Sequence, residues 1–121
     1  MDKEILKKRT KSFSIEIARL VQSLPFNIIN KNYSNQIVRC SSSVGANYRA
    51  ACRAKSKADF INKLKIVEEE LDETMFFLEL LNKFNPEHKA TIINLWKEAN
   101  ELLSIIVSSI TTLRKSIEKQ S

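Results

Sequence analysis

Residues 92–117 read IINLWKEANELLSIIVSSITTLRKSI, and this stretch decides the fold. Apolar side chains recur in it every three or four residues, which is the spacing of one face of an α-helix. The stripe consists of Ile92, Trp96, Ala99, Leu103, Ile106, Ile110, Leu113 and Ile117. We therefore expect a long amphipathic helix that buries this face against other helices.

Two segments in the first half of the chain have the same periodicity. A helix is expected from about residue 3 to Leu24, because Pro25 cannot continue it. Residues 25–33 are expected to form a link, after which Ser34 is a good N-cap for a second helix that reaches about Ala54. The apolar stripes are Phe13, Ile17, Leu20, Val21 and Leu24 in the first helix, and Ile37, Cys40, Val44, Tyr48 and Ala51 in the second.

A third helix fills the space between these two segments and the C-terminal stripe. Ser56 followed by Asp59 resembles a capping box and marks its start, and it is expected to end near Phe84. Asn85 is then expected to cap the last helix, with Pro86 at the first helical position. The third apolar stripe is Phe60, Leu64, Val67, Leu71, Met75 and Leu78.

The composition agrees with four helices and short links. Only one glycine and two prolines occur in 121 residues, whereas strand-rich folds need many turn residues. We predict an all-α protein, an antiparallel up-down-up-down four-helix bundle, with residues 1–121 forming a single domain.

Neither a membrane span nor a secretion signal is expected. The chain has no run of about 18 apolar residues, and its first residues lack the basic-then-apolar pattern of a signal peptide. Cys40 and Cys52 lie about 18 Å apart along one predicted helix, which is too far for a disulfide. These features predict a cytoplasmic protein with reduced thiols, and leave a disulfide with another chain as the open alternative.

We predict no catalytic residue, no cofactor site and no metal site. His88 is the only histidine, and bundle metal sites need Glu-x-x-His pairs on two helices. A single glycine excludes a glycine-rich phosphate loop. The acidic run at residues 68–73 is interpreted as a solvated or ion-paired helix face, and the protein is not expected to be an enzyme.

Charge is strongly segregated along the chain. The net charge is +6, but residues 31–65 contain eight basic side chains and one acidic side chain, a net charge of +7. Residues 66–82 contain six acidic side chains and none that is basic, a net charge of −6. The positive block could bind a polyanion such as RNA, and the negative block could neutralise it within the fold or between subunits.

Three arginines on one side of the second helix are the candidate binding residues. Arg39, Arg49 and Arg53 project within about 80° of one another, and the small residues Ser42 and Ala46 lie between them. Small residues beside guanidinium groups let another backbone approach. That backbone is either nucleic acid, since arginine suits phosphate geometry, or another subunit that presents the carboxylates of the third helix.

Gly45 indicates a close contact on the same helix. Glycine inside a helix costs about 1 kcal/mol relative to alanine. We therefore expect another backbone to pass close to this position.

The third helix has a second apolar face, formed by Ile66, Phe77, Leu80 and Phe84 on the side opposite its core stripe. One explanation is that this helix is the most buried of the four. The other is a subunit contact, because exposed apolar patches are uncommon on monomers. We favour the subunit contact and expect a homo-oligomer.

A longer sequence pattern lies within residues 34–81. It consists of Gln36, Arg39, Ser43-Val44-Gly45-Ala46-Asn47-Tyr48-Arg49, Ala51, Arg53, Ser56, Asp59-Phe60, Lys63 and Glu70-x-x-Glu73-Thr74. The pattern resembles the bacterial four-helix bundle family named after proteins encoded in intervening sequences of 23S ribosomal RNA genes. It is distantly similar to the accessory variability determinant of diversity-generating retroelements, a basic pentameric barrel that binds a reverse transcriptase and nucleic acid.

The resemblance implies a left-handed up-down-up-down bundle that assembles as a ring-like pentamer without catalytic activity. It also implies that Arg39, Arg49, Arg53 and Lys63 are the candidate nucleic-acid-binding residues. The leading hypothesis is a basic homo-oligomer that associates with RNA, DNA or a nucleoprotein partner. The alternative is a structural or protein-interaction scaffold whose arginines form subunit ion pairs with Glu69, Glu70 and Glu73.

Overall fold

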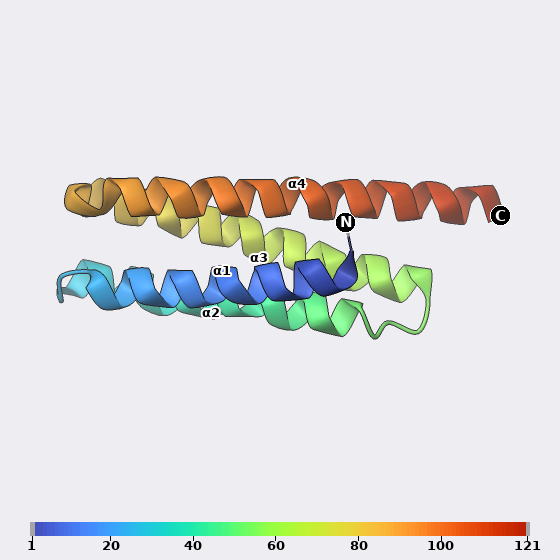
Figure 1. Cartoon of the computed structure of the whole chain (residues 1–121), viewed down its shortest axis with the longest axis horizontal. Coiled ribbons are helices and arrows are strands. Elements are labelled where there is room, and N and C mark those ends of the chain that lie inside the picture. The colour runs from blue at the N-terminus through green and yellow to red at the C-terminus, as the bar shows by residue number, and fades with distance from the viewer. Residues whose placement is uncertain (1, 121) are drawn as a thin grey trace.

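The computed structural model of the chain describes residues 2–120, and side chains for residues 2–119. It contains four α-helices and one short 3₁₀ turn (Figure 1). The helices are α1 (Lys3–Ser23), α2 (Ile28–Ala51), α3 (Lys57–Phe84) and α4 (Lys89–Gln120), and the 3₁₀ turn η1 (Pro86–His88) precedes α4. The all-α fold and the four helices are therefore as predicted.

Contacts between neighbouring helices show that successive helices run in opposite directions. In each pair, residue numbers rise along one helix as those of the partner residues fall along the next. The pairs are Ser14–Ser41 and Thr10–Gly45 for α1 and α2, Tyr33–Phe84 and Arg39–Glu73 for α2 and α3, and Glu79–Trp96 and Lys57–Ser116 for α3 and α4.

The core follows the predicted stripes closely. Every stripe residue of α2 is buried, and so is every stripe residue of α3 except Phe60, which is partly buried. On α4, Ile106 is fully buried whereas Trp96 is only partly buried. The sequence stripes omitted the buried apolar residues Leu6, Ile61, Leu81, Leu95 and Leu102.

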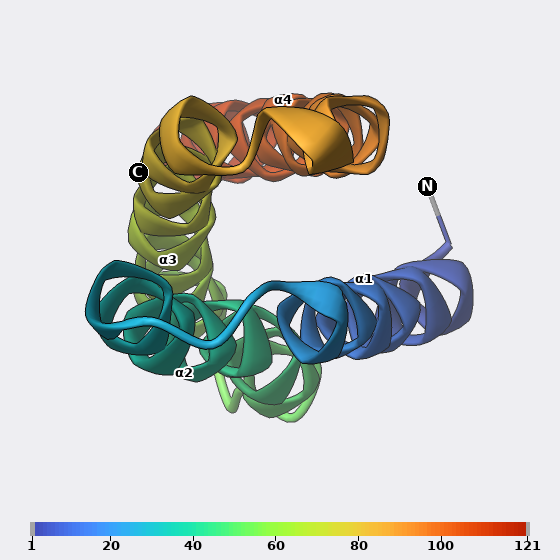
Figure 2. The ribbon, with the colours of Figure 1, turned by 90° about the vertical axis from the view of Figure 1, so that its left-hand side faces the viewer.

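The bundle is open between its first and last helices. Seen along the helices, α2 and α3 lie side by side, while α1 and α4 are set apart from each other (Figure 2). The interface of α1 with α4 is the smallest between helix pairs in contact. It contains an ion pair in which Arg9 donates two hydrogen bonds to Glu98, at 2.7 and 2.8 Å, and lies 3.0 Å from Glu101.

The predicted N-cap of α2, Ser34, is wrong by seven residues. The helix begins at Ile28, with the side chain of Asn27 accepting a hydrogen bond from the Asn30 amide at 2.9 Å, and Ser34 is buried inside the helix. Asn27 is as good an N-cap as Ser34, but the apolar residues that follow it are exposed and do not continue the core stripe. The additional turns place Tyr33 against α3.

Asn85 occupies the predicted N-cap position, with Pro86 after it at the start of η1, but the Asn85 side chain makes no capping bond. It is 1% exposed and pairs instead with Asn30, each amide donating to the other at 2.8 and 2.9 Å. Asn85 also donates to the Leu81 carbonyl, and Asn30 to the Pro25 carbonyl. Buried amides need such partners, so the pair fastens the α1–α2 link to the α3–α4 link.

Gly45 lies at a close helix contact, as predicted, but the neighbouring backbone belongs to α1 of the same chain. A Cβ atom added there would lie 3.6 Å from the Thr10 carbonyl oxygen and 3.7 Å from the Lys11 nitrogen. The Ser14 hydroxyl donates to the Ser41 carbonyl at 2.7 Å beside this contact. Gly45 therefore marks the point where α1 crosses close to α2.

Candidate polyanion-binding surface

Basic side chains from α1 and α2 meet on one surface. Lys7, Lys8 and Lys11 project from one side of α1. Arg49 lies in the last turn of α2, and Arg53 lies in the turn that follows this helix. The close crossing at Gly45 brings the two sets together, and with Glu4 they line a shallow recess of about 250 Å³. We call these five basic residues the basic face.

Most of the charge on the basic face is not neutralised within the chain. Lys7 pairs with Glu4 at 2.7 Å. Within residues 2–120, the other four members, Lys8, Lys11, Arg49 and Arg53, are exposed and have no carboxylate at salt-bridge distance. Clustered like charges repel one another, so an anion placed in the recess would relieve the repulsion.

Arg39 lies elsewhere on α2 and is already paired. Its guanidinium lies 2.6 Å from Glu73 and 3.4 Å from Glu70, both on α3. The hydrogen bond to Glu73 is the main cause that raises the pKa of Arg39, whereas burial raises the pKa of Glu70. The structure thus separates Arg39 from Arg49 and Arg53, which sequence spacing had grouped together.

Lys63 does not join the basic face either. It projects from α3, is partly buried, and lies 3.2 Å from Asp59 one turn earlier. The hydrogen bond from Lys63 lowers the pKa of Asp59. Asp59 also receives a weak bond from the Lys55 amide, while Ser56 caps α3 as predicted.

Sequence reasoning missed the three α1 lysines of the basic face, Lys7, Lys8 and Lys11. The signal was available, because residues 7–11 read KKRTK, which is four basic residues in five. Arg9 of this run points the other way, to Glu98 and Glu101 on α4, and these bonds raise its pKa above the ordinary value. Only the crossing of α1 over α2 shows which lysines lie beside Arg49 and Arg53.

The second apolar face of α3 is partly covered by the chain itself. Tyr33 packs against Phe77 and Phe84, with ring centroids 6.2 and 6.1 Å apart. Phe77 and Leu80 are partly buried, whereas Ile66 is 41% exposed and Phe84 53% exposed. The neighbouring Phe76 is also exposed, so an apolar surface for a subunit contact is smaller than expected but present.

The remaining reactive side chains do not form a centre. Burial raises the pKa of the Cys40 thiol, which accepts a hydrogen bond from Thr74 at 3.2 Å. Throughout residues 2–120 there is no group of three or more His, Cys, Asp or Glu side chains able to hold a metal ion. In the same range, no helix is long and apolar enough to cross a membrane.

Comparison with known proteins agrees with this fold. A crystal structure of a protein of unknown function from the S23 ribosomal protein family of Bacteroides thetaiotaomicron superimposes with a TM-score of 0.79. The two chains are 31% identical, and the match covers 92% of this chain and 99% of that one. No curated protein matches the chain. Residues 2–108 match the 23S rRNA-intervening sequence protein family, and the chain therefore belongs to that family.

Proposed function

We propose that the protein is a non-catalytic, homo-oligomeric binding module whose basic face contacts the phosphate backbone of nucleic acid. The observation that carries the proposal is the group of four exposed cations, Lys8, Lys11, Arg49 and Arg53, around one recess without carboxylate partners in the described chain. Arginine forks fit phosphate oxygens, and lysines add unspecific positive charge.

Binding is expected to tolerate different sequences. The exposed phenylalanines are Phe26, Phe76 and Phe84, and none of them lines the recess of the basic face. Base stacking therefore has no platform there, and contacts to phosphate carry little sequence information. The dominant energetic term would be counterion release, which depends strongly on salt.

Oligomerisation would multiply a modest surface. The basic face offers few phosphate contacts per chain, but a ring such as the pentamer implied by the family resemblance would present several faces to one strand. The exposed parts of Ile66, Phe76 and Phe84 are the surface available on α3 for such assembly.

The second candidate function is a protein scaffold. The ion pairs of Arg39 with Glu73 and Glu70 favour it, because they show that α3 carboxylates can neutralise an α2 arginine. In the described chain this happens within one subunit. A scaffold would need Arg49 and Arg53 to find carboxylates on another subunit in the same way.

The deciding experiment removes three unpaired charges and measures two properties. Lys8→Ala/Arg49→Ala/Arg53→Ala is compared with the parent by light scattering and by fluorescence anisotropy with generic RNA and DNA at two salt concentrations. If the proposal holds, mass is unchanged, affinity falls, and the slope of log K against log salt decreases by about 0.7 to 0.9 for each lost phosphate contact.

A matched control keeps the same change of charge. Lys31→Ala/Lys83→Ala/Lys89→Ala removes three exposed lysines at the other end of the bundle and should bind almost as the parent does. Equal loss in both variants would indicate a response to net charge alone. Lost mass without any nucleic-acid binding in the parent would reject the proposal and favour the scaffold.

A further inference from the structure

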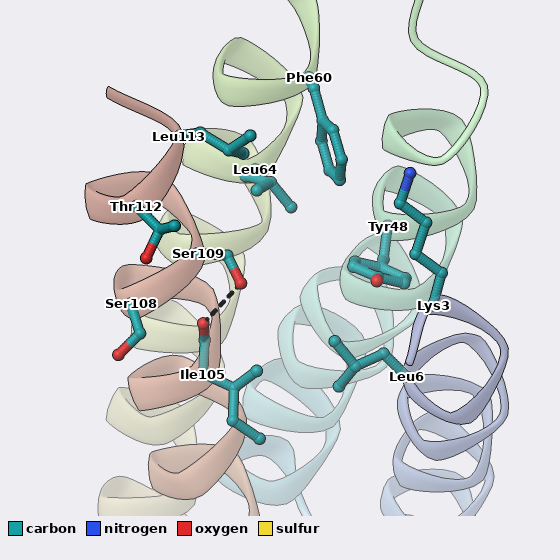
Figure 3. A pocket seen from close by; sticks show the side chains of 10 residues that line it. All are labelled: Lys3, Leu6, Tyr48, Phe60, Leu64, Ile105, Ser108, Ser109, Thr112 and Leu113. Carbon is teal, nitrogen blue, oxygen red and sulfur yellow. Dashed lines mark hydrogen bonds between the residues drawn. The ribbon is translucent and has the colours of Figure 1, made fainter. Parts of the chain in front are cut away.

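A second concave site lies apart from the basic face, at the end of the bundle where α1 begins and α2 ends. We call this the open end. It is a cavity of about 420 Å³ to which all four helices contribute (Figure 3). Leu6 and Tyr48 form one side, Phe60 and Leu64 the back, and Ile105 and Leu113 the opposite side. Its volume falls within the range of small-molecule pockets.

The sequence of α4 explains why this space is not filled. The residues that α4 presents here include Ser108, Ser109 and Thr112, all small, whereas nearer the middle of the bundle α4 buries Leu102 and Ile106. The Ser109 hydroxyl donates to the Ile105 carbonyl of its own helix at 3.0 Å, so it requires no partner across the gap. The smallest helix interface, α1 with α4, is left open beside these residues.

The charge of the lining selects the kind of ligand. Lys3 is the only charged residue among those that line the cavity. Its ammonium lies 4.8 Å from the centroid of the Phe60 ring, and it has no carboxylate at salt-bridge distance in the part of the chain that the structure describes. A cation at the rim of an apolar cavity complements an amphipathic anion.

We propose that this cavity binds a small amphipathic carboxylate, an unbranched or aromatic apolar body with one anionic head, in the manner of a medium-chain fatty acid. The head pairs with Lys3, and the body displaces water from the partly exposed side chains of Phe60, Ile105 and Leu113. The inference is independent of the nucleic-acid proposal, because no residue of the basic face lines the cavity.

Decanoate is the test ligand, with the full-length protein and calorimetric titration as the readout. Decanoate is expected to bind saturably at one site per chain and to displace 1-anilinonaphthalene-8-sulfonate. Decanol should bind several-fold more weakly and decylamine more weakly still, because neither offers an anion to Lys3. Equal affinity for decanoate and decylamine would overturn the charge argument.

Two variants locate the binding. Ser109→Leu fills the cavity and should abolish decanoate binding, with Thr112→Leu as a second filling variant should the first lose helicity. Lys3→Gln should weaken decanoate binding by up to about fivefold, which corresponds to one exposed ion pair, while leaving decanol binding unchanged. Arg49→Ala/Arg53→Ala is the control that keeps the cavity and should bind decanoate as the parent does.

Two other occupants would give different results. If the cavity meets a membrane lipid, the protein would associate with vesicles containing phosphatidylglycerol but show no saturable binding of free decanoate. If a second copy of the chain covers it, Ser109→Leu would change the mass of the assembly and decanoate would not bind. Either result would reject the proposal.

Discussion

The two ends of the bundle differ in how completely their polar groups are paired and their apolar space is filled. Where the α1–α2 and α3–α4 links meet, Asn30 and Asn85 are buried and saturate each other's amides and nearby carbonyls. The α2–α3 link, the start of α1 and the last turns of α4 lie toward the other end (Figure 1). In the part of the chain that the structure describes, this end gathers exposed lysines and arginines without carboxylate partners around one recess, and a cavity of about 420 Å³ is left unfilled.

The difference separates residues that hold the fold from residues that are available for binding. A polar group that is buried and fully hydrogen-bonded has no free donor or acceptor for a ligand. Removing its partner destabilises the fold, because the group is then buried without a hydrogen bond. Unpaired exposed charges and unfilled apolar space contribute little to stability and gain most from a ligand. Both binding proposals fall at the end that the Asn30–Asn85 pair does not fasten.

Breaking the Asn30–Asn85 pair should change the free energy of unfolding more than any change at the open end. Asn85→Ala leaves the Asn30 carbonyl oxygen buried without a donor and is expected to lower the free energy of unfolding by about 1 to 3 kcal/mol. Urea denaturation monitored by circular dichroism measures the change. Ser109→Ala, at the open end, should stay within about 0.5 kcal/mol of the parent.

A double-mutant cycle checks the mechanism of that loss. If the two amides act as one unit, Asn30→Ala/Asn85→Ala should cost less than the sum of the two single changes. Additive losses would mean that the reciprocal bonds are not the origin of the effect. Equal losses for Asn85→Ala and Ser109→Ala would remove the contrast between the two ends.

The fold was accessible from the sequence because its signals are local. Apolar residues that repeat every three or four positions identify the buried face of a helix. Ser56 marks a helix start because its side chain caps the first turn, and Pro25 marks a helix end because proline cannot continue a helix. The start of α2 escaped because two competing N-caps, Asn27 and Ser34, can only be told apart by what the additional turns pack against. Tyr33 of α2 supplies that packing by contacting Phe77 and Phe84 of α3, and α3 is distant in sequence.

The candidate site was less accessible because it depends on which helix lies next to which. Arg39 and Arg49 have similar sequence surroundings, yet α3 supplies carboxylates to the first and α1 supplies lysines to the recess of the second. Angular position on one helix says nothing about the neighbouring helix. The grouping of Lys8 with Arg49 therefore required the packed structure.

Gly45→Ala is expected to raise the free energy of unfolding moderately, whereas Asn85→Ala lowers it. The new methyl group would meet the α1 backbone at 3.6 Å, an ordinary van der Waals contact, and alanine restores helix propensity and restricts the unfolded chain. Stability should rise by about 0.5 to 1 kcal/mol. Thermal and urea denaturation measure the gain.

A larger side chain at the same position sharpens the result. Gly45→Leu would need the α1 backbone to move and should destabilise the protein and disturb the basic face, which depends on this crossing. If Gly45→Ala destabilised the protein as well, the helices would be packed more closely than the Thr10 contact indicates. Nucleic-acid affinity of Gly45→Ala should equal that of the parent.

The smallest expected effect is a difference in pH dependence along α3, which runs between the two ends. The pKa of Asp59, at the open end, is lowered from its ordinary 3.8 by the hydrogen bond from Lys63. Ionised Asp59 therefore favours the folded state, and this contribution is present above the unfolded pKa and lost as pH falls through the folded pKa. The pKa of Glu70, in the middle of α3, is raised from 4.5 chiefly by burial. Its contribution has the opposite sign, because it is present below the unfolded pKa and lost as pH rises through the folded pKa.

Urea denaturation of two variants between about pH 3 and pH 7 separates these contributions. Relative to the parent, Asp59→Asn should become less stable as pH rises through the acid range, because it lacks the ionised carboxylate that Lys63 holds. Glu70→Gln should become relatively more stable over its own range, since it removes a carboxylate that burial disfavours, and Arg39 keeps its closer partner Glu73 at 2.6 Å. Curves of the same sign for both variants would show that the contact of Glu70 with Arg39 outweighs its burial, and the ion pairs of α2 with α3 would then stabilise the fold as the Lys63–Asp59 pair does.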